Sequence, residues 1–346
     1  MGEQTRDLIV VGASAGGVEA LREFAGGLPG NLDAAVLVVL HLPPGGASAL
    51  PAILARSGPL PVETAVHELS LEHGRIYVAP PDHHLLVRDG RMQLSRGPTE
   101  NGYRPAVDVL FRSAAQAHGD GVIGVVLSGS LDDGSAGLAS IKSRGGLALV
   151  QDPGDALYPG MPESALARVA VDQVLSANEM GAVLGGLVRE PTNGGSGPPS
   201  RLEEVEDRIA RAESAIGIGI PEVVDVSQPS GLACPDCHGV LFTVDELHSR
   251  YRCRVGHAWT AQALLEQQSK DVEHALWAAL RALEEKRDLA RRMSRNAREH
   301  GFGYVAERYT RHHDEASGAA DTLRRYLLGG SLLPGGANEE PPGESA

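Results

Sequence analysis

Aromatic residues, cysteines and long apolar runs are scarce in this chain of 346 residues. Aromatic side chains make up 4% of it, and there are 3 cysteines, too few for a disulfide framework but compatible with a reducing compartment. No apolar run approaches the length of about 20 residues that spans a bilayer, and the opening residues Met1 to Asp7 are polar. We therefore expect a cytoplasmic protein with no signal peptide and no membrane insertion.

Positive charge is also in deficit. Lys and Arg number 31 against 45 Asp and Glu, for a formal net charge of -14. Because clustered Lys and Arg drive binding to phosphates, this balance argues against a nucleic-acid partner. The apolar fraction of 42% is ordinary for a globular protein, and the length suffices for one large core and a second, smaller module.

The stretch around which the chain is organised runs from Leu8 to Leu21. It predicts a buried strand, a glycine-rich turn with Ser14 at its apex, and a helix. A dinucleotide site and a P-loop share that outline, but the turn contains no lysine, and the next apolar run, Ala34 to Leu40, ends in His41 instead of an acidic residue. On this stretch alone, a nucleotide site and a nucleophilic serine are equally supported.

Apolar runs alternate with helical patterns over the first half of the chain. This alternation predicts an α/β fold with a doubly wound, mostly parallel sheet and helices on both faces. A hairpin is expected at Tyr77 to Val87, around Pro80 and Pro81. The expected strands are 8–11, 34–40, 76–79, 122–127 and 148–150, and the expected helices are 18–27, 47–57, 105–117, 135–143 and 162–167.

Three residue types of a hydrolytic triad follow three of these strands. Ser14, His41 and the pair Asp132-Asp133 each come after a strand, and ligands of such sheets bind at the carboxyl ends of the strands. A serine hydroxyl needs a base to take its proton, and a carboxylate usually orients that base. The pattern favours a nucleophilic serine over a nucleotide site.

Residues 7 to about 185 resemble the catalytic domain of the chemotaxis protein-glutamate methylesterases, the CheB family. The motif around Ser14 is close to the family's GAS[TA]GG, and His41-Leu42-Pro43-Pro44 matches its HxPP. The remaining matches, in family order, are Tyr77 to Pro80, Pro105 to Phe111, Ser128 to Gly134, and Val150 to Asp152 with Tyr158 to Pro162.

The resemblance implies a role for each site residue. Ser14 would be the nucleophile, His41 the general base and acid, and Asp133 the carboxylate that orients His41. The backbone amide of Ser130 would help to form the oxyanion hole, and catalysis would need no cofactor. Asp132 is interpreted as a solvated loop residue.

The implied reaction is hydrolysis of glutamate γ-methyl esters on a chemoreceptor-like protein, with glutamine deamidation as a further activity of the same machinery. Two departures from the family pattern bear on control and substrate choice. The chain begins almost directly with the first catalytic strand, so no receiver domain is expected, and the loop Ser130-Leu131-Asp132 differs from the usual Met-Gly-Asn type.

All three cysteines lie in one short C-terminal segment. Cys234 and Cys237 form a CxxC pair, and Cys253 and His257 form a CxxxH pair, which together predict a structural Zn²⁺ site. His238 and His248 are alternatives to His257. Cys234 to His238 also matches a haem-attachment pattern, which the lack of a secretory signal disfavours.

The expected organisation has five parts: a catalytic domain (1–190), a linker with a short, solvated helix (191–227), a zinc-binding knuckle (228–259), a helical hairpin broken at Gly301 to Gly303 (260–328) and a disordered tail (329–346). The expected substrate is a methylated receptor or other signalling protein, and a methyltransferase or histidine kinase is a further candidate partner. Two other readings stay open: a non-catalytic scaffold that recruits such partners through the zinc-helical module, and a nucleotide-binding module.

Overall fold

A computed structural model describes residues 5–43, 45, 48–192, 199–212, 228–245 and 249–329. The chain divides into two compact units, Met1–Leu264 and Leu265–Ala346, which are described separately. The expected tail lies, from residue 330 onward, outside the described residues, as do positions 193–198 and 213–227 of the expected linker. None of the described helices is both long enough and apolar enough to span a bilayer.

The first unit is built on a seven-stranded sheet in which every pairing is parallel. This confirms the predicted α/β fold with a doubly wound sheet. The short edge strands β3 and β9 were not predicted. In spatial order the strands are β3 (Val62–Thr64), β4 (Ile76–Val78), β2 (Ala35–Leu40), β1 (Leu8–Ala13), β7 (Val122–Val126), β8 (Leu147–Gln151) and β9 (Gln173–Leu175).

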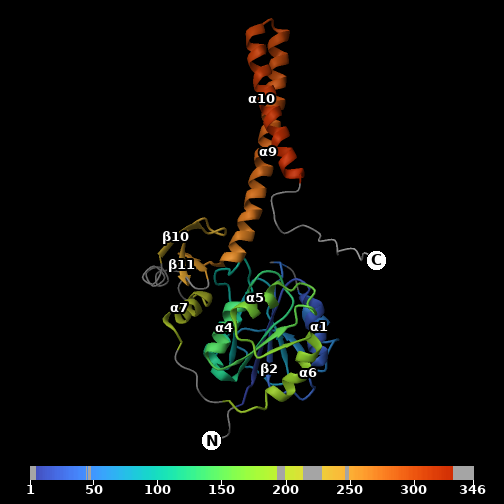
Figure 1. The fold of residues 1–346 in the computed structure, drawn as a ribbon, viewed down its shortest axis with the longest axis vertical. Coiled ribbons are helices and arrows are strands. Elements are labelled where there is room, and N and C mark those ends of the chain that lie inside the picture. The colour runs from blue at the N-terminus through green and yellow to red at the C-terminus, as the bar shows by residue number, and fades with distance from the viewer. Residues whose placement is uncertain are drawn as a thin grey trace, which may run out of the picture. The chain divides into compact units, whose positions relative to one another are not determined.

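Helices cover both faces of this sheet (Figure 1). Along β1, Ile9 and Val11 pack towards one layer and Leu8 and Val10 towards the other, the alternation expected of a strand that is buried on both sides. The first layer contains α1 (Gly17–Gly27), α2 (Leu50–Leu54) and α6 (Ala177–Leu187); the second contains α3 (Val107–His118), α4 (Ser135–Ser143) and α5 (Gly160–Arg168). A short 3₁₀ turn, Gly119–Gly121, precedes β7.

The predicted hairpin at Tyr77 to Val87 is wrong in its position. Ile76–Val78 belongs to the parallel sheet, and the hairpin pairs β5 (His84–Arg88) with β6 (Arg91–Ser95). Its turn is Asp89-Gly90, where both residues have positive φ (48° and 69°). An Asp-Gly pair suits such a tight turn, whereas the two prolines on which the prediction rested lie in the connection before it.

A helix and an antiparallel ribbon complete the first unit. The helix α7 spans Arg201–Ala210, and the ribbon contains β10 (Gln228–Ala233), β11 (Val240–Asp245), β12 (Arg250–Cys253) and β13 (Ala258–Thr260) in that order. The expected solvated face of α7 is present only in part: Arg201 and Glu204 are exposed, but the charged Glu206 is buried together with Val205 and Ile209. Glu206 is neutralised by arginines from β12, which no local pattern in the helix reveals.

The second unit consists of two helices that run antiparallel. It contains most of α9 (Ala261–Glu299) and all of α10 (Gly303–Leu328), so the expected break at Gly301 to Gly303 is confirmed. Near the turn, the Ser294 hydroxyl donates to the Ala306 carbonyl at 3.0 Å. Farther from the turn, Arg324 pairs with Glu284, and small residues such as Ala290 and Ala316 are buried between the helices.

Candidate active site

Ser14 lies in the turn between β1 and α1. Gly16 has φ 67°, a left-handed conformation that a glycine adopts without strain, and α1 begins at the next residue. The Ser14 amide donates to the Ser128 carbonyl at 2.9 Å, which joins this turn to the loop after β7. The hydroxyl is therefore presented at the carboxyl edge of the sheet, as the sequence predicted.

His41 follows β2, the strand next to β1, and its ring connects the other two members of the predicted triad. Its Nδ1 is 3.1 Å from the Ser14 hydroxyl, and its Nε2 is 2.7 Å from Asp133 Oδ2. An Asp133 carboxylate can only accept, so Nε2 carries the proton and Nδ1 has a free lone pair towards Ser14. The structure thus brings together Ser14, His41 and Asp133 in the geometry of a nucleophile, a base and an orienting acid.

The carboxylate of Asp133 is held by the first turn of α3. Its Oδ2 accepts from the Val107 amide at 2.7 Å, and its Oδ1 accepts from the amides of Asp108 (3.2 Å) and Gly134 (3.1 Å). Unpaired amides at a helix N-terminus favour a negative charge. The predicted match at Pro105 to Phe111 is therefore the segment that holds the triad acid.

A second buried carboxyl, Asp108, lies beside Asp133. It accepts hydrogen bonds from the amides of Gly134 and Gly137 at 3.0 and 2.7 Å. Burial, and then the charge of Asp133, raise the pKa of Asp108 to about 7. This residue was not predicted as part of the site, although its place in the matched segment was a usable signal.

The loop after β7 contains the other predicted residues. Gly129 donates to the Tyr158 carbonyl at 2.9 Å and accepts from the Met161 amide at 2.8 Å, which packs two of the matched motifs together. Ser130 is exposed at the tip of this loop. Asp132 is not a solvated residue as expected: it is buried, and its Oδ1 accepts from the Thr260 hydroxyl at 2.8 Å.

Tyr103 completes the surroundings of the triad. Its ring is stacked on the His41 ring, with centroids 3.7 Å apart and an interplanar angle of 7°. A cavity of about 500 Å³ opens over Ser14 and His41, and its other lining residues are Ala15, Leu42, Pro43, Asp82, Thr99, Gly102, Tyr103 and Arg104. No sequence pattern near a tyrosine in a polar loop predicts such a contact, so Tyr103 was not predicted as part of the site.

The predicted metal ligands also come together, within the ribbon. The ligand atoms of Cys234, Cys237, Cys253 and His257 all lie within 4.8 Å of one another. Three of these separations are 3.7 Å and 3.5 Å from His257 Nδ1 to the sulfurs of Cys234 and Cys253, and 3.6 Å between the sulfurs of Cys237 and Cys253. Tetrahedral ligands about 2.3 Å from a Zn²⁺ stand roughly 3.7 Å apart, so the donor set fits this ion.

The alternative histidines are not supported as ligands. His238 has φ 59° in the tight turn after Cys237, and it does not belong to the ligand cluster found among the described residues. His248 lies outside the described part of the chain.

The region of the chain that contains this site is similar to known proteins. A protein-glutamate methylesterase/protein-glutamine glutaminase of Paraburkholderia xenovorans is 42% identical over 180 residues, which are 51% of this chain and 49% of that protein. The protein-glutamate methylesterase/protein-glutamine glutaminase 2 of Methanosarcina mazei is 37% identical over 192 residues, or 53% of this chain and 52% of that protein. The chain thus spans about half the length of these relatives.

A solved structure and a family model cover the same region. The crystal structure of the Thermotoga maritima CheB methylesterase catalytic domain is similar with a TM-score of 0.51 and 32% identity, over 54% of this chain and 100% of that one. The family model described as CheB methylesterase matches residues 9–184, slightly more than half of the chain. On this evidence the chain belongs to the CheB methylesterase family.

Proposed function

We propose that the chain is a cytoplasmic serine hydrolase that removes methyl groups from glutamate γ-methyl esters of a chemoreceptor-like signalling protein. The observation that supports it most is the hydrogen-bonded series from Ser14 through His41 to Asp133, with distances of 3.1 and 2.7 Å. The series opens into a cavity large enough for an extended side chain. The names of the relatives point to the same chemistry.

The reaction proceeds in two steps. Ser14 Oγ attacks the ester carbonyl while His41 Nδ1 takes its proton, and His41 then returns that proton to the departing methanol. Water, deprotonated by the same nitrogen, attacks the acyl-enzyme and releases glutamate, and His41 returns the proton to Ser14 Oγ. Asp133 keeps the Nε2 proton in place and stabilises the imidazolium that forms in each step.

The negative charge that develops on the carbonyl oxygen needs donors about 3 Å away. The backbone amide of Ser130, at the exposed tip of the loop after β7, is the proposed donor. Because this donor belongs to the backbone, the side chain at position 130 can differ from the family pattern. A glutamine side chain in the same place would lose ammonia instead of methanol, which gives the deamidase activity.

Methanol release from receptor helices that carry glutamate methyl esters tests this function. Ser14→Ala removes the nucleophile and should reduce the rate by several orders of magnitude. Ser143→Ala is the matched control, because that hydroxyl is exposed on α4 and donates to the Ser140 carbonyl. Equal rates in the two variants would contradict the proposal.

We further propose that Cys234, Cys237, Cys253 and His257 bind a structural Zn²⁺. Four protein ligands leave no open position for a substrate, so the ion would stabilise the ribbon and take no part in the reaction. The purified protein should contain about one equivalent of zinc, and Cys237→Ser should lose it. His238→Ala should retain the metal, and a metal-free wild-type protein would contradict the assignment.

The helical hairpin is the proposed contact for a methyltransferase or a histidine kinase. Its two helices expose Trp277, Leu289 and Tyr304, whose exposed fractions are 43%, 55% and 80%. Titration of the full chain with each purified partner from the same organism tests this. Binding that survives replacement of all three side chains by Ser would contradict it.

A further inference from the structure

The ribbon lies against one of the loops that form the active site. Ala258 of β13 accepts from the Asn101 amide at 2.8 Å and donates to the Thr99 carbonyl at 3.2 Å, so Glu100 forms an isolated parallel bridge with the ribbon's last strand. Asn101 Oδ1 accepts from the Thr260 amide at 2.8 Å, and the Thr99 hydroxyl donates to Asp236 at 2.9 Å. Every bond in this set joins the loop to the ribbon.

The same loop leads directly to the triad. Gly102 packs beside Trp259, where a Cβ would lie 3.4 Å from the indole ring, and the next residue is Tyr103, stacked on His41. One segment of five residues therefore joins a strand of the ribbon to the ring that covers the base. Tyr103 limits where the imidazole can move, because one whole face of the His41 ring is in contact with it.

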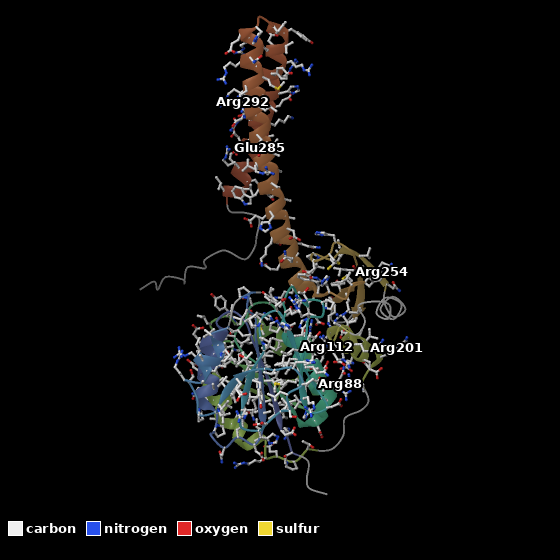
Figure 2. All side chains as sticks on the ribbon, turned by 180° about the vertical axis from the view of Figure 1, so that it is seen from behind. Arg88, Arg112, Arg201, Arg254, Glu285 and Arg292 are labelled. Carbon is white, nitrogen blue, oxygen red and sulfur yellow. The ribbon has the colours of Figure 1, made fainter. Side chains whose placement is uncertain are left out.

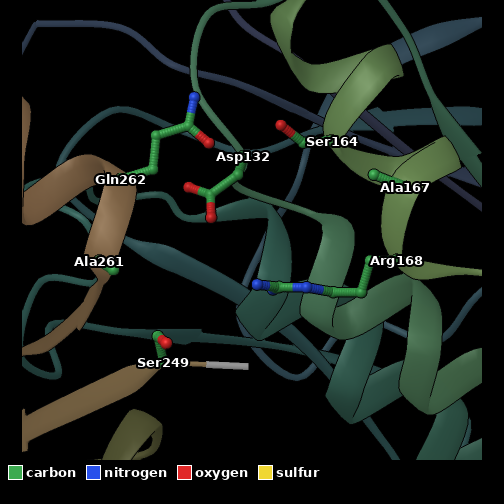
Figure 3. Close-up of a pocket in the computed structure, with 7 residues that line it drawn as sticks. All are labelled: Asp132, Ser164, Ala167, Arg168, Ser249, Ala261 and Gln262. Carbon is green, nitrogen blue, oxygen red and sulfur yellow. The ribbon is translucent and has the colours of Figure 1, made fainter. Parts of the chain in front are cut away.

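A second active-site loop also contacts the ribbon. Leu131 has φ 66° and packs against the ribbon's apolar cluster, which includes Cys234, Cys253 and Trp259. The neighbouring Asp132 accepts from Thr260. These two residues stand between Ser130 and Asp133, and they are two of the three positions at which the loop Ser130-Leu131-Asp132 departs from the family's usual pattern. Figure 3 shows Asp132 facing Gln262, which follows the ribbon, across a pocket that Arg168 also lines.

Buried charges fix the position of the ribbon on the α/β domain. Arg252 of β12 donates to Glu100 at 2.9 Å and to Glu206 at 2.8 Å, and Arg112 of α3, labelled in Figure 2, donates to Glu100 at 2.7 Å. Burial by itself raises the pKa of Glu100, but the charges of Arg112 and Arg252 outweigh it and hold the pKa at about 2. Such a network tolerates few alternative geometries, because any displacement leaves a buried charge unpaired.

We infer that the metal-binding ribbon is a positioning element of the active site. It holds the Tyr103 ring against His41, and through Asp132 it holds the loop that leads to Asp133. The inference rests on the proposed function of the triad. Its consequence is that the metal site, although closed to substrate, governs the reactivity of Ser14. Tyr103 acts through His41 and is a positioning residue, not a catalytic one.

The test measures how fast Ser14 is phosphonylated by an alkyl fluorophosphonate, a probe that reports triad reactivity without the natural substrate. Full-length protein is compared when loaded with zinc, after removal of the metal with a chelator, and after zinc is restored. Metal removal should slow the reaction about 10- to 100-fold, and zinc should restore it, because small misplacements of catalytic groups have effects of that size. An unchanged rate in metal-free protein would overturn the inference.

Variants separate positioning from general loss of structure. Tyr103→Leu should slow phosphonylation while zinc content and far-UV circular dichroism stay unchanged, and Tyr103→Phe should restore most of the rate because it keeps the ring. Metal removal should then slow phosphonylation by a smaller factor in Tyr103→Leu than in wild type, since the ring through which the ribbon acts is already absent. If metal removal slowed phosphonylation equally in both proteins, an effect of the ribbon through Tyr103 would be contradicted.

Val240→Ala, at a half-exposed position on β11, is the control and should leave both the metal and the rate unchanged.

Failure of the proposed function has a different signature. A zinc-loaded wild type that is phosphonylated, and responds to the metal as described, yet releases no methanol, would overturn the substrate assignment only. A zinc-loaded wild type that never reacted with the probe would contradict both.

Discussion

The carboxylate of Asp133 accepts a hydrogen bond from the backbone amide of Val107 at 2.7 Å through the same oxygen that faces His41 Nε2. The triad acid is thus fixed by the N-terminus of α3, and its negative charge is favoured there. The orientation of the base depends on a helix from a different part of the chain.

Asp133→Asn should nearly abolish hydrolysis while leaving the fold intact. If the Asn oxygen takes the place of Oδ1 and accepts from the amides of Asp108 and Gly134, its NH₂ group takes the place of Oδ2 and faces His41, and Nε2 must accept. Nδ1 would then carry the proton and could not take one from Ser14. The rate of phosphonylation should fall by about 10⁴-fold. Asp89→Asn, on the exposed β5–β6 turn, is the control, and a similar loss in it would show that the effect is not specific to the triad.

Asp108 should make stability depend on pH. Its pKa is raised to about 7, so the folded protein binds a proton that the unfolded chain has released above about pH 4. Stability from this group is complete below pH 4 and is lost as the pH rises through 7. Asp108→Asn keeps a carbonyl acceptor for Gly134 and Gly137 but cannot ionise. In urea unfolding from pH 4 to 8, the free energy of unfolding of the variant should rise relative to that of wild type by at least on the order of 1 kcal/mol. A difference independent of pH would contradict this assignment.

Gly12→Ala should displace the N-terminus of α3, which holds Asp133. A Cβ at Gly12 would lie 2.2 Å from Val107 Cγ1, so α3 must shift away from β1 and from Asp133. Overpacking of this kind costs about 1–3 kcal/mol, and the phosphonylation rate should fall as well. Gly186→Ala is the matched control in α6, where a built Cβ meets no described atom within 4 Å. That change should be neutral or stabilising, and equal destabilisation of the two variants would refute the argument.

Arg252→Met should destabilise the first unit strongly. After the substitution Glu100 pairs only with Arg112, and Glu206 pairs with Arg250 and Arg112. The two buried carboxylates therefore share one guanidinium fewer than in wild type. Removing one partner of a buried network typically costs about 3–5 kcal/mol. Arg254→Met, two residues away and exposed over Phe242, should cost less than about 1 kcal/mol. Denaturant unfolding of both proteins checks the difference, and similar midpoints would contradict the role given to the network.

The proximity of Ser14, His41 and Asp133 was predictable because its signals are local. Ser14 and His41 directly follow apolar runs, and a parallel sheet places the carboxyl ends of its strands at one edge. The clustering of Cys234, Cys237, Cys253 and His257 was predictable for the same reason, since their spacing within one short segment is itself the signal.

What the sequence could not show depends on partners far along the chain. Asp132 and Glu206 lie in polar surroundings that suit solvated residues, and each is buried only because Thr260 or Arg252 lies opposite. Tyr103 is in a loop whose course follows from its pairing with Ala258, more than 150 positions away. Local patterns carry no information about such contacts, so the link between ribbon and triad emerges only from the structure.

The measurement that tests the central claim most directly is methanol release from methylated receptor helices by wild type, Ser14→Ala and Ser143→Ala. The triad geometry predicts that wild type and Ser143→Ala release methanol at the same rate and that Ser14→Ala releases it at least about 10³-fold more slowly. Methanol release that persists in Ser14→Ala, or is absent from a folded and zinc-loaded wild type, would contradict it.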